Sequence, residues 1–386
     1  MNGPKVSRSI RSLLALGMVA SSLALGGAAS AQTLTKDARP DNVPAGAVYT
    51  LTNSSSANAV AVFDRAANGT LSPRGTYATG GQGTGSGLGS QGALAFSKAD
   101  KWLFAVNAGS NEISAFSVDP VGLTLFDKVP SGGTRPISLT SAKDVLYVLN
   151  AGVPANITGF YINGDGTLTH INGSTRPLSS SSDVGPAQVQ FSPNGRLLVV
   201  TEKMTNKIDT YTVDKNGVAS GPTVHDSAGM TPFGFAFAGR DTIVVSEAFG
   251  GAPNASAASS YNLDRMGDPT VVTASSPTHQ TAACWVAISK NNRYAYAANT
   301  GSGNITGYSI ADDGSLSLLD PSGVSGVLGA GSTPIDVAFN NSGRYLYSLG
   351  AGLHGIGAFR MESDGSLSPL GTVTGLPVGT VGLLAR

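Results

Sequence analysis

One stretch of sequence decides the fold: residues 334–367, which read PIDVAFNNSGRYLYSLGAGLHGIGAFRMESDGSL. An apolar segment at 334–339 is followed by a Gly-Arg-Tyr turn and a second apolar segment at 345–350. A third segment ends on the aromatic residue Phe359, and an Asp-Gly pair then leads into a final short segment. Short apolar runs separated by turn residues are typical of β-strands. The stretch therefore predicts a unit of four antiparallel strands.

The same unit recurs along the chain, and the aromatic residue of its third segment marks each copy. The seven marks are Phe63, Phe116, Phe160, Tyr211, Tyr261, Tyr308 and Phe359. They are 44–53 residues apart, which is about the length of one four-stranded propeller blade. The sequence therefore predicts an all-β chain that folds as a seven-bladed β-propeller.

The two ends of the repeat array are each incomplete. The first copy starts at Val48-Tyr49-Thr50-Leu51, a second strand without a first. The chain finishes at Thr380-Val381-Gly382-Leu383, a first strand with nothing after it. Pairing these segments in one shared blade would remove the open sheet edges that they otherwise leave. We therefore expect the amino- and carboxy-terminal strands to close the ring together.

Turns of the Asn-Gly or Asp-Gly type stand at the same place in five copies. They are Asn68-Gly69, Asp165-Gly166, Asn216-Gly217, Asp313-Gly314 and Asp364-Gly365. Such pairs are a strong hairpin signal, and the usual two-residue hairpin turn needs φ > 0 at both residues. None of the acidic residues belongs to a D-x-D-x-D-G loop, so we interpret them as turn residues rather than calcium ligands.

The first 31 residues have the pattern of a cleaved signal peptide. The basic residues are Lys5, Arg8 and Arg11. An apolar stretch at 13–28 follows, and Ala29-Ser30-Ala31 offers a small-residue cleavage site. We expect cleavage after Ala31, an extension at 32–45 and the propeller at 46–386. The mature protein would then be secreted or periplasmic, without a membrane span.

Composition excludes several classes of function. The chain has 24 Lys and Arg against 24 Asp and Glu, and only 12% of its residues are charged. No basic patch is visible, which argues against nucleic acid as a partner. Cys284 is the only cysteine, so no disulfide can form within the chain. No H-E-x-x-H or C-x-x-C motif occurs, and we predict a monomer without metal or cofactor.

One glycine-rich segment imitates a nucleotide-binding motif. Residues 87–92 read Gly-Leu-Gly-Ser-Gln-Gly and match G-x-G-x-x-G. A dinucleotide site needs a strand before this motif and a helix after it. Here a strand-like segment, Ala93-Leu94-Ala95-Phe96, follows instead. We interpret the segment as a loop between blades.

Candidate site residues follow from where propeller ligands usually bind, at one mouth of the central channel. Each blade contributes the loop that leads into its inner strand and the loop that leaves its second strand. Glu202 and Glu247 leave the second strands of adjacent blades, and two carboxyl groups facing one cavity could serve as an acid and a base. The alternative is local pairing, with Lys203 or Lys207 neutralising Glu202. Further candidate ligand-binding residues at equivalent positions are Asn107, Asn150, Gln188, Trp285, Asn299 and Asp336.

The segment Pro186-Ala187-Gln188-Val189-Gln190-Phe191-Ser192-Pro193-Asn194-Gly195-Arg196-Leu197 resembles the inner-strand signature of lactonase-type propellers. Leu146-Tyr147-Val148-Leu149-Asn150 is similar to the Tyr-Val-x-Asn repeats of that family, and so is Leu346-Tyr347-Ser348-Leu349. The family includes propeller 6-phosphogluconolactonases and carboxymuconate cyclases. The resemblance implies a seven-bladed propeller over nearly the whole mature chain.

The resemblance also implies which functional residues are missing. The family's Pro-His-x-His stands as Pro186-Ala187-Gln188-Val189, and its Pro-Arg-His stands as Pro232-Phe233-Gly234. Asn299-Thr300 replace an Arg that is frequent in the family, and only Glu247 carries over. Phosphorylated sugars and muconates need cations, so the resemblance favours a neutral or weakly charged ligand.

Two hypotheses remain open from the sequence. In the first, the protein is a diverged lactone hydrolase or cycloisomerase, with Glu247 as the base and Glu202 as its partner. In the second, it is a non-catalytic binding or scaffold propeller for a small molecule, carbohydrate, peptide or protein partner. The missing His and Arg favour the second, and the two Glu residues favour the first.

Overall fold

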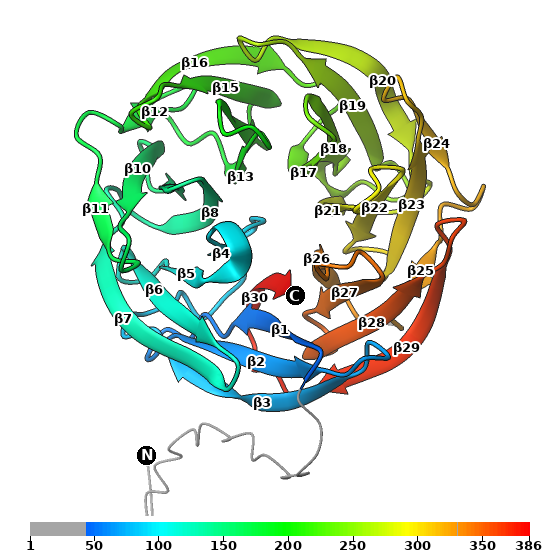
Figure 1. Cartoon of the computed structure of the whole chain (residues 1–386). Coiled ribbons are helices and arrows are strands. Elements are labelled where there is room, and N and C mark those ends of the chain that lie inside the picture. Colours follow the sequence, from blue (N-terminus) through cyan, green and yellow to red (C-terminus); the bar gives the residue numbers. More distant parts are fainter. Residues whose placement is uncertain (1–43, 330) are drawn as a thin grey trace, which may run out of the picture. The chain divides into compact units, whose positions relative to one another are not determined.

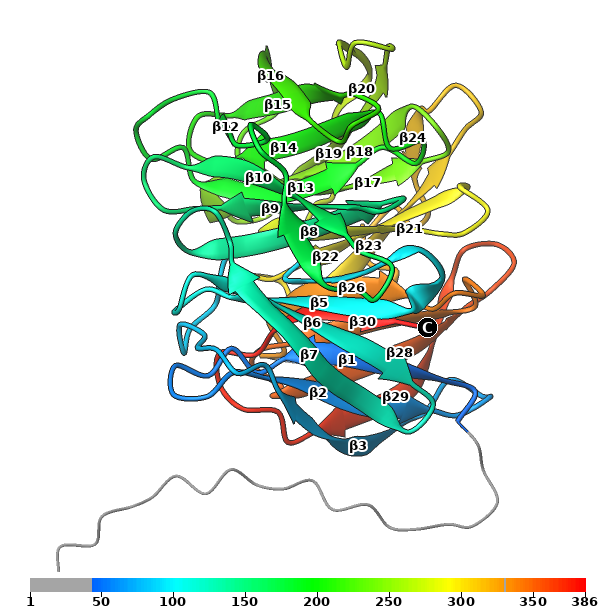
Figure 2. The same cartoon turned by 60° about the vertical axis from the view of Figure 1, so that its left-hand side comes forward.

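The computed structural model describes residues 44–329 and 331–386, which form seven antiparallel sheets arranged as blades around a central channel (Figure 1). The predicted seven-bladed all-β fold is confirmed. We name each blade after its innermost strand, from the β30 blade through the β4, β8, β13, β17, β21 and β26 blades. In Figure 2 the outer strands β3, β7 and β29 lie on the outside of the ring.

The first three blades contain β30 (Val381–Ala385), β1 (Gly46–Leu51), β2 (Ala59–Arg65) and β3 (Leu71–Ala78); β4 (Leu94–Phe96), β5 (Trp102–Asn107), β6 (Glu112–Asp119) and β7 (Gly122–Pro130); and β8 (Pro136–Ala142), β9 (Val145–Asn150), β10 (Asn156–Ile162), β11 (Leu168–His170) and β12 (Arg176–Pro177). The next two contain β13 (Pro186–Phe191), β14 (Leu197–Glu202), β15 (Lys207–Val213) and β16 (Ala219–Asp226); and β17 (Pro232–Ala238), β18 (Thr242–Glu247), β19 (Ala257–Leu263) and β20 (Pro269–Pro277). The last two contain β21 (Ala283–Ile288), β22 (Tyr294–Asn299), β23 (Asn304–Ile310), β24 (Leu316–Leu318) and β25 (Gly326–Val327); and β26 (Pro334–Phe339), β27 (Tyr345–Gly350), β28 (Gly355–Met361) and β29 (Leu367–Thr374). Two 3₁₀ turns are η1 (Lys98–Asp100) and η2 (Phe249–Gly251).

Both ends of the array meet in the β30 blade, as predicted. β1 pairs antiparallel with β30, with Val48 opposite Ala385. The hydroxyl of Thr50 donates to the carbonyl of Val381 at 3.2 Å. The guanidinium of Arg65 donates to the carbonyl of Arg386 at 3.0 Å. These contacts join residues more than 300 positions apart and close the ring.

Burial follows the position of each strand within its blade. The second strands β14 and β22 are buried at every residue, because blades pack against both of their faces. The outer strand β16 is mostly exposed, and only its first residue, Ala219, is buried. Sheets buried on both faces read as continuous apolar runs, and half-exposed sheets alternate. This explains why the inner segments of each repeat were the clearest in the sequence.

The Asx-Gly turns form as predicted, with a different backbone. Gly166 has a φ of 90°, whereas the φ of Asp165 is not positive. The expected pair of positive φ angles was therefore wrong. Instead the Asp165 carboxylate accepts a hydrogen bond from the amide of Thr167 at 3.0 Å, which is an Asx turn, and glycine takes the left-handed position.

Tyrosines of the second strands bind these turns in the neighbouring blade. The hydroxyl of Tyr147 donates to the carbonyl of Gly217 at 2.8 Å, and the hydroxyl of Tyr347 donates to that of Gly69 at 2.8 Å. Both tyrosines are fully buried. A buried hydroxyl needs a hydrogen-bond partner. Each of these second-strand tyrosines therefore joins its blade to the Asx-Gly turn of the next blade.

The predicted signal peptide at 1–31 and nearly all of the extension at 32–45 fall outside the described residues. Within the described part of the chain, no helix is long and apolar enough to cross a membrane.

Candidate functional site

The loop between β3 and β4, residues 79–93, crosses the mouth of the central channel where the inner strands begin. We call it the channel loop. Its Ser90 hydroxyl donates to the carbonyl of Ile137 at 2.9 Å. The backbone N–H of Gln91 donates to the carbonyl of Ala187 at 3.1 Å. The loop therefore contacts the β8 and β13 blades, which follow its own β4 blade in the ring.

The same loop is fixed to the opposite side of the ring. The Gln91 side chain donates to the carbonyl of Val286 at 2.8 Å and accepts from the amide of Val286 at 3.0 Å. The indole nitrogen of Trp285 donates to the carbonyl of Ser90 at 2.9 Å. The G-x-G-x-x-G segment is thus a bridge across the channel, a role that its interpretation as a simple interblade loop missed.

Gln91 takes the place of a side chain that the β17 blade lacks. In the β13 blade, Gln188 binds both backbone groups of Phe235 in the next inner strand, at 2.8 and 2.9 Å. The equivalent residue of β17 is Gly234, which cannot reach Val286. A Cβ on Gly234 would lie 2.2 Å from the side-chain oxygen of Gln91. The missing side chain makes room for Gln91, which then binds Val286 as Gln188 binds Phe235.

Asp336 occupies the equivalent position in β26 and also binds the neighbouring strand. Its carboxylate accepts from the amide of Val337 at 2.8 Å and from the backbone of Leu383. Burial raises the pKa of Asp336 well above its usual range. Gln188 and Asp336, both predicted to bind ligand, therefore contact adjacent inner strands in this structure.

Aromatic side chains lie beneath the channel loop. The rings of Phe233 and Trp285 have centroids 4.8 Å apart, and the ammonium of Lys203 lies 4.8 Å from the Phe233 centroid. Lys203 also donates to the carbonyl of Pro186 at 3.2 Å, and burial lowers its pKa to about 8. Burial raises the pKa of the neighbouring Cys284 thiol to about 12, so this thiol is protonated and a poor nucleophile at neutral pH.

Glu202, at the end of β14, is fully buried and bound within its own surroundings. It accepts hydrogen bonds from the amide of Ser179 at 3.0 Å, from the Ser179 hydroxyl at 2.6 Å and from the Thr205 hydroxyl. Lys203 donates to the channel loop, and Lys207 pairs with Asp226. Neither lysine is therefore the partner that the alternative interpretation assigned to Glu202.

Glu247, at the end of β18, has a separate set of partners. The hydroxyl of Ser275 donates to it at 2.7 Å, the hydroxyl of Ser259 donates to its other oxygen, and the Gly229 backbone is a third partner. Burial raises the pKa of Glu247 despite these donors. Among the described residues, no hydrogen bond links Glu247 with Glu202, so each carboxyl has its own environment inside its blade.

The three asparagines at equivalent positions are also fully buried. Asn107 donates to the Ser114 hydroxyl at 2.7 Å, and Asn299 donates to the Thr306 hydroxyl at 2.8 Å. Asn150 donates to the carbonyl of Ser131 at 3.2 Å. Each asparagine amide therefore binds a hydroxyl or a carbonyl of its own blade or the loop before it, while the side-chain oxygens of Asn150 and Asn299 have no hydrogen-bond partner among the described residues.

Asp209 is a functional candidate that the sequence reasoning missed. It occupies the position in β15 that holds Ser114, Ser259 and Thr306 in other blades, and it is fully buried. Neither of its oxygens receives a hydrogen bond of normal geometry from the described residues. Burial and the adjacent Glu202 raise the pKa of Asp209 to about 8. The signal in the sequence was the carboxyl of Asp209, which replaces the hydroxyl found at this position in other copies of the repeat.

Comparison with known proteins shows the family of this chain. The family model described as lactonase, seven-bladed β-propeller, matches residues 46–175 and 244–373. The chain belongs to this family. A search of curated proteins gave no match.

Solved structures of similar fold cover almost the whole lactonase-family propeller. A putative 6-phosphogluconolactonase from Bacteroides fragilis is 18% identical, with 90% of this chain and 100% of that chain covered, at a TM-score of 0.67. A protein from Lactobacillus plantarum is 19% identical, with coverages of 88% and 99%, at a TM-score of 0.70. A periplasmic gluconolactonase from Pseudomonas aeruginosa is 17% identical, with coverages of 86% and 98%, at a TM-score of 0.66. At these identities the likeness supports the fold alone.

The family match omits residues 176–243, which fold as β12–β17 and the start of β18. This segment carries Gln188, Glu202, Asp209 and Gly234. The unmatched segment thus contains the buried carboxyl pair and Gly234, whose missing side chain makes room for Gln91. Among the described residues, no group of three or more His, Cys, Asp or Glu side chains is placed to hold a metal ion.

Proposed function

We propose that this lactonase-family propeller is a non-catalytic, exported binding or scaffold protein whose channel mouth is sealed by its own channel loop. The observation that carries the proposal is the bridge from Gln91 to Val286, together with the Trp285 contact to Ser90. These contacts fill the position at which a propeller ligand would sit. A ligand at this mouth would have to displace them first.

The chemistry of the mouth supports the same proposal. Gln188 and Asp336 contact neighbouring inner strands, and Trp285 contacts the channel loop. Lys203 is a buried cation at this mouth, and it donates to backbone carbonyls of Gly89 and Pro186. An anionic lactone would therefore compete with existing protein contacts for Lys203. The export part of the proposal rests on the pattern at residues 5–31, and the protein is expected to act as a monomer.

A second candidate function is lactone hydrolysis or cyclisation by the buried carboxyl groups. The observation that favours it is the adjacency of Glu202 and Asp209, because burial and the nearby Glu202 raise the pKa of Asp209, and a carboxyl with a raised pKa can serve as an acid. Glu247, with a pKa raised by burial, would be the alternative base. A substrate could touch either group only after the loops above it had moved, because both are fully buried.

Turnover assays separate the two candidates. We expect the purified mature protein to hydrolyse 6-phosphogluconolactone and gluconolactone no faster than the spontaneous reaction. Rates above that background would support the enzyme hypothesis if Glu247→Gln or Asp209→Asn lowered them roughly 10²-fold, the usual scale for loss of a general base. A heat-denatured sample is the control, because it measures the hydrolysis that occurs without the folded protein.

A further inference from the structure

The face of the ring opposite the channel loop contains a cleft between the β4 and β8 blades. Its volume is about 450 Å³, within the size range of small-molecule sites. The β4 blade supplies the turn around η1, and the β8 blade supplies a tight turn between β8 and β9 together with the end of β10. The lining side chains include Lys98, Lys101, Trp102, Lys143 and Asp144.

Three of these side chains are lysines on exposed backbone turns. Within the described part of the chain, none of Lys98, Lys101 and Lys143 forms an ion pair. The ammonium of Lys101 lies 4.4 Å from the centroid of the Trp102 ring. The cleft therefore gathers three positive charges against the single carboxylate of Asp144, with cations available to a ligand.

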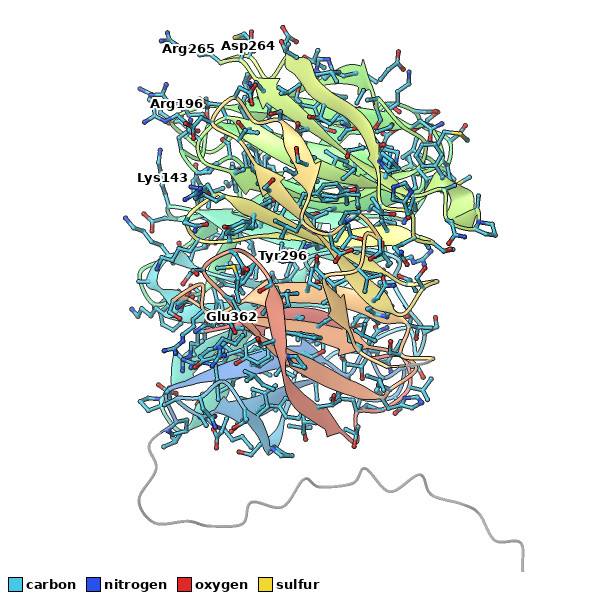
Figure 3. The ribbon with its side chains drawn as sticks, turned by 90° about the vertical axis from the view of Figure 1, so that its right-hand side faces the viewer. Lys143, Arg196, Asp264, Arg265, Tyr296 and Glu362 are labelled. Carbon is cyan, nitrogen blue, oxygen red and sulfur yellow. The ribbon has the colours of Figure 1, made fainter. Side chains whose placement is uncertain are left out.

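Charge on this face is arranged in two concentric rings. The turns between first and second strands lie nearest the channel, and six of them, from the β4 to the β26 blade, contain eight Lys and Arg against three Asp. The turns between third and fourth strands lie farther out and contain two Lys and Arg against eight Asp and Glu. In Figure 3, Lys143 and Arg196 of the inner ring lie at the left-hand edge of the molecule, and Asp264 of the outer ring lies near its top. A positive centre with a negative rim attracts a small anion and repels a broad anionic surface.

The floor of the cleft is rigid enough to present these charges. The Trp102 ring packs against Phe126 at a centroid distance of 4.9 Å. Gly166 of the next blade approaches the same ring so closely that a Cβ there would lie 2.7 Å from it. The Trp102 ring is therefore held between two blades, and the three lysines beside it are exposed to solvent.

From these observations we infer that the cleft between the β4 and β8 blades binds small polyvalent oxyanions, such as tricarboxylates or phosphate. Lysine ammonium groups bind carboxylate and phosphate oxygens through charge-assisted hydrogen bonds. The site lies on the face opposite the channel loop, and it is independent of the proposed function of the channel mouth.

Tryptophan fluorescence can report the binding directly. The chain has two tryptophans. Trp102 lines the cleft, and Trp285 lies under the channel loop. In a Trp285→Phe variant, Trp102 is the sole reporter. We expect saturable changes in its fluorescence on titration with citrate or inorganic phosphate at low ionic strength, and none with glucose. Comparing citrate with phosphate identifies which class of oxyanion the site prefers.

Matched charge variants test whether the cleft itself is the site. Replacing Lys98, Lys101 and Lys143 together by Gln should weaken citrate or phosphate binding about tenfold or more. The control replaces Arg240, Lys290 and Arg293 by Gln, which removes the same charge from exposed turns of the inner ring in other blades. It should weaken binding about threefold or less, through the long-range field alone. Equal losses in both variants, or no saturable binding below about 10 mM, would overturn the inference.

Discussion

A chain that ends at Val378 is expected to accumulate as insoluble protein. The truncation removes β30, and with it the partner of β1. Val381 and Leu383 are buried in the native structure, and burying each such side chain contributes about 1.5–3 kcal/mol. The truncation also removes the backbone partner of the buried Asp336 carboxyl. The exposed edge of β1 would then be open to pairing with other chains.

A milder pair of substitutions keeps this prediction measurable where the truncated chain cannot be purified. Leu383→Ala should lower the free energy of unfolding by about 2–5 kcal/mol, as large-to-small core substitutions do. Val378→Ala, at a residue that is 74% exposed, is the control and should change it by less than about 0.5 kcal/mol. Soluble, cooperatively unfolding protein from the truncated gene would show that the ring does not depend on β30.

Asp209→Asn is expected to stabilise the protein at alkaline pH. The pKa of Asp209 is about 8 in the folded protein, against about 3.9 in an unfolded chain. The folded state therefore binds a proton more tightly, so this group's contribution to stability is full below about pH 4 and is lost as pH rises to about 8. Asn keeps the shape of the side chain but does not ionise.

The variant should thus match the wild type near pH 4 and exceed its free energy of unfolding by roughly 3–5 kcal/mol at pH 8.5. Urea denaturation at several pH values measures the difference. Asp226→Asn is the control, because Asp226 is exposed and pairs with Lys207, which lowers its pKa. That variant should show no gain at high pH. A loss of stability in Asp209→Asn at pH 8.5 would mean that the site needs the ionised carboxylate, and it would contradict the prediction.

Much of the fold could be predicted from the sequence because the same pattern of strands and turns occurs in seven copies. The aromatic marks, the Asx-Gly turns and the two incomplete ends are local signals that any one blade repeats, and the shared blade of β1 and β30 follows from them. The turn backbone was predicted wrongly, because the Asx side chain in these longer turns replaces the second positive φ angle.

The site was harder to predict because it depends on departures from the repeat. Comparison of equivalent positions correctly located Glu202 and Glu247 at the ends of β14 and β18. An alignment of repeats does not show, however, which residues form hydrogen bonds with a buried side chain. The channel loop contacts the β8, β13 and β21 blades, and such long-range contacts produce no periodic pattern in the sequence. Two departures from the repeat were visible in the sequence. Gly234 has no side chain, and Asp209 has a carboxyl, where the equivalent residues of other blades differ.

The central claim is that the channel loop seals the mouth, and hydrogen exchange at the Val286 amide tests it most directly. This amide donates to the Gln91 side chain at 3.0 Å, as the Phe235 amide donates to Gln188 at 2.8 Å. In the wild type we expect the two amides to exchange at similarly slow rates. In Gln91→Ala we expect Val286 to exchange at least tenfold faster while Phe235 is unchanged. Fast exchange of Val286 in the wild type, or no effect of Gln91→Ala, would contradict a sealed channel.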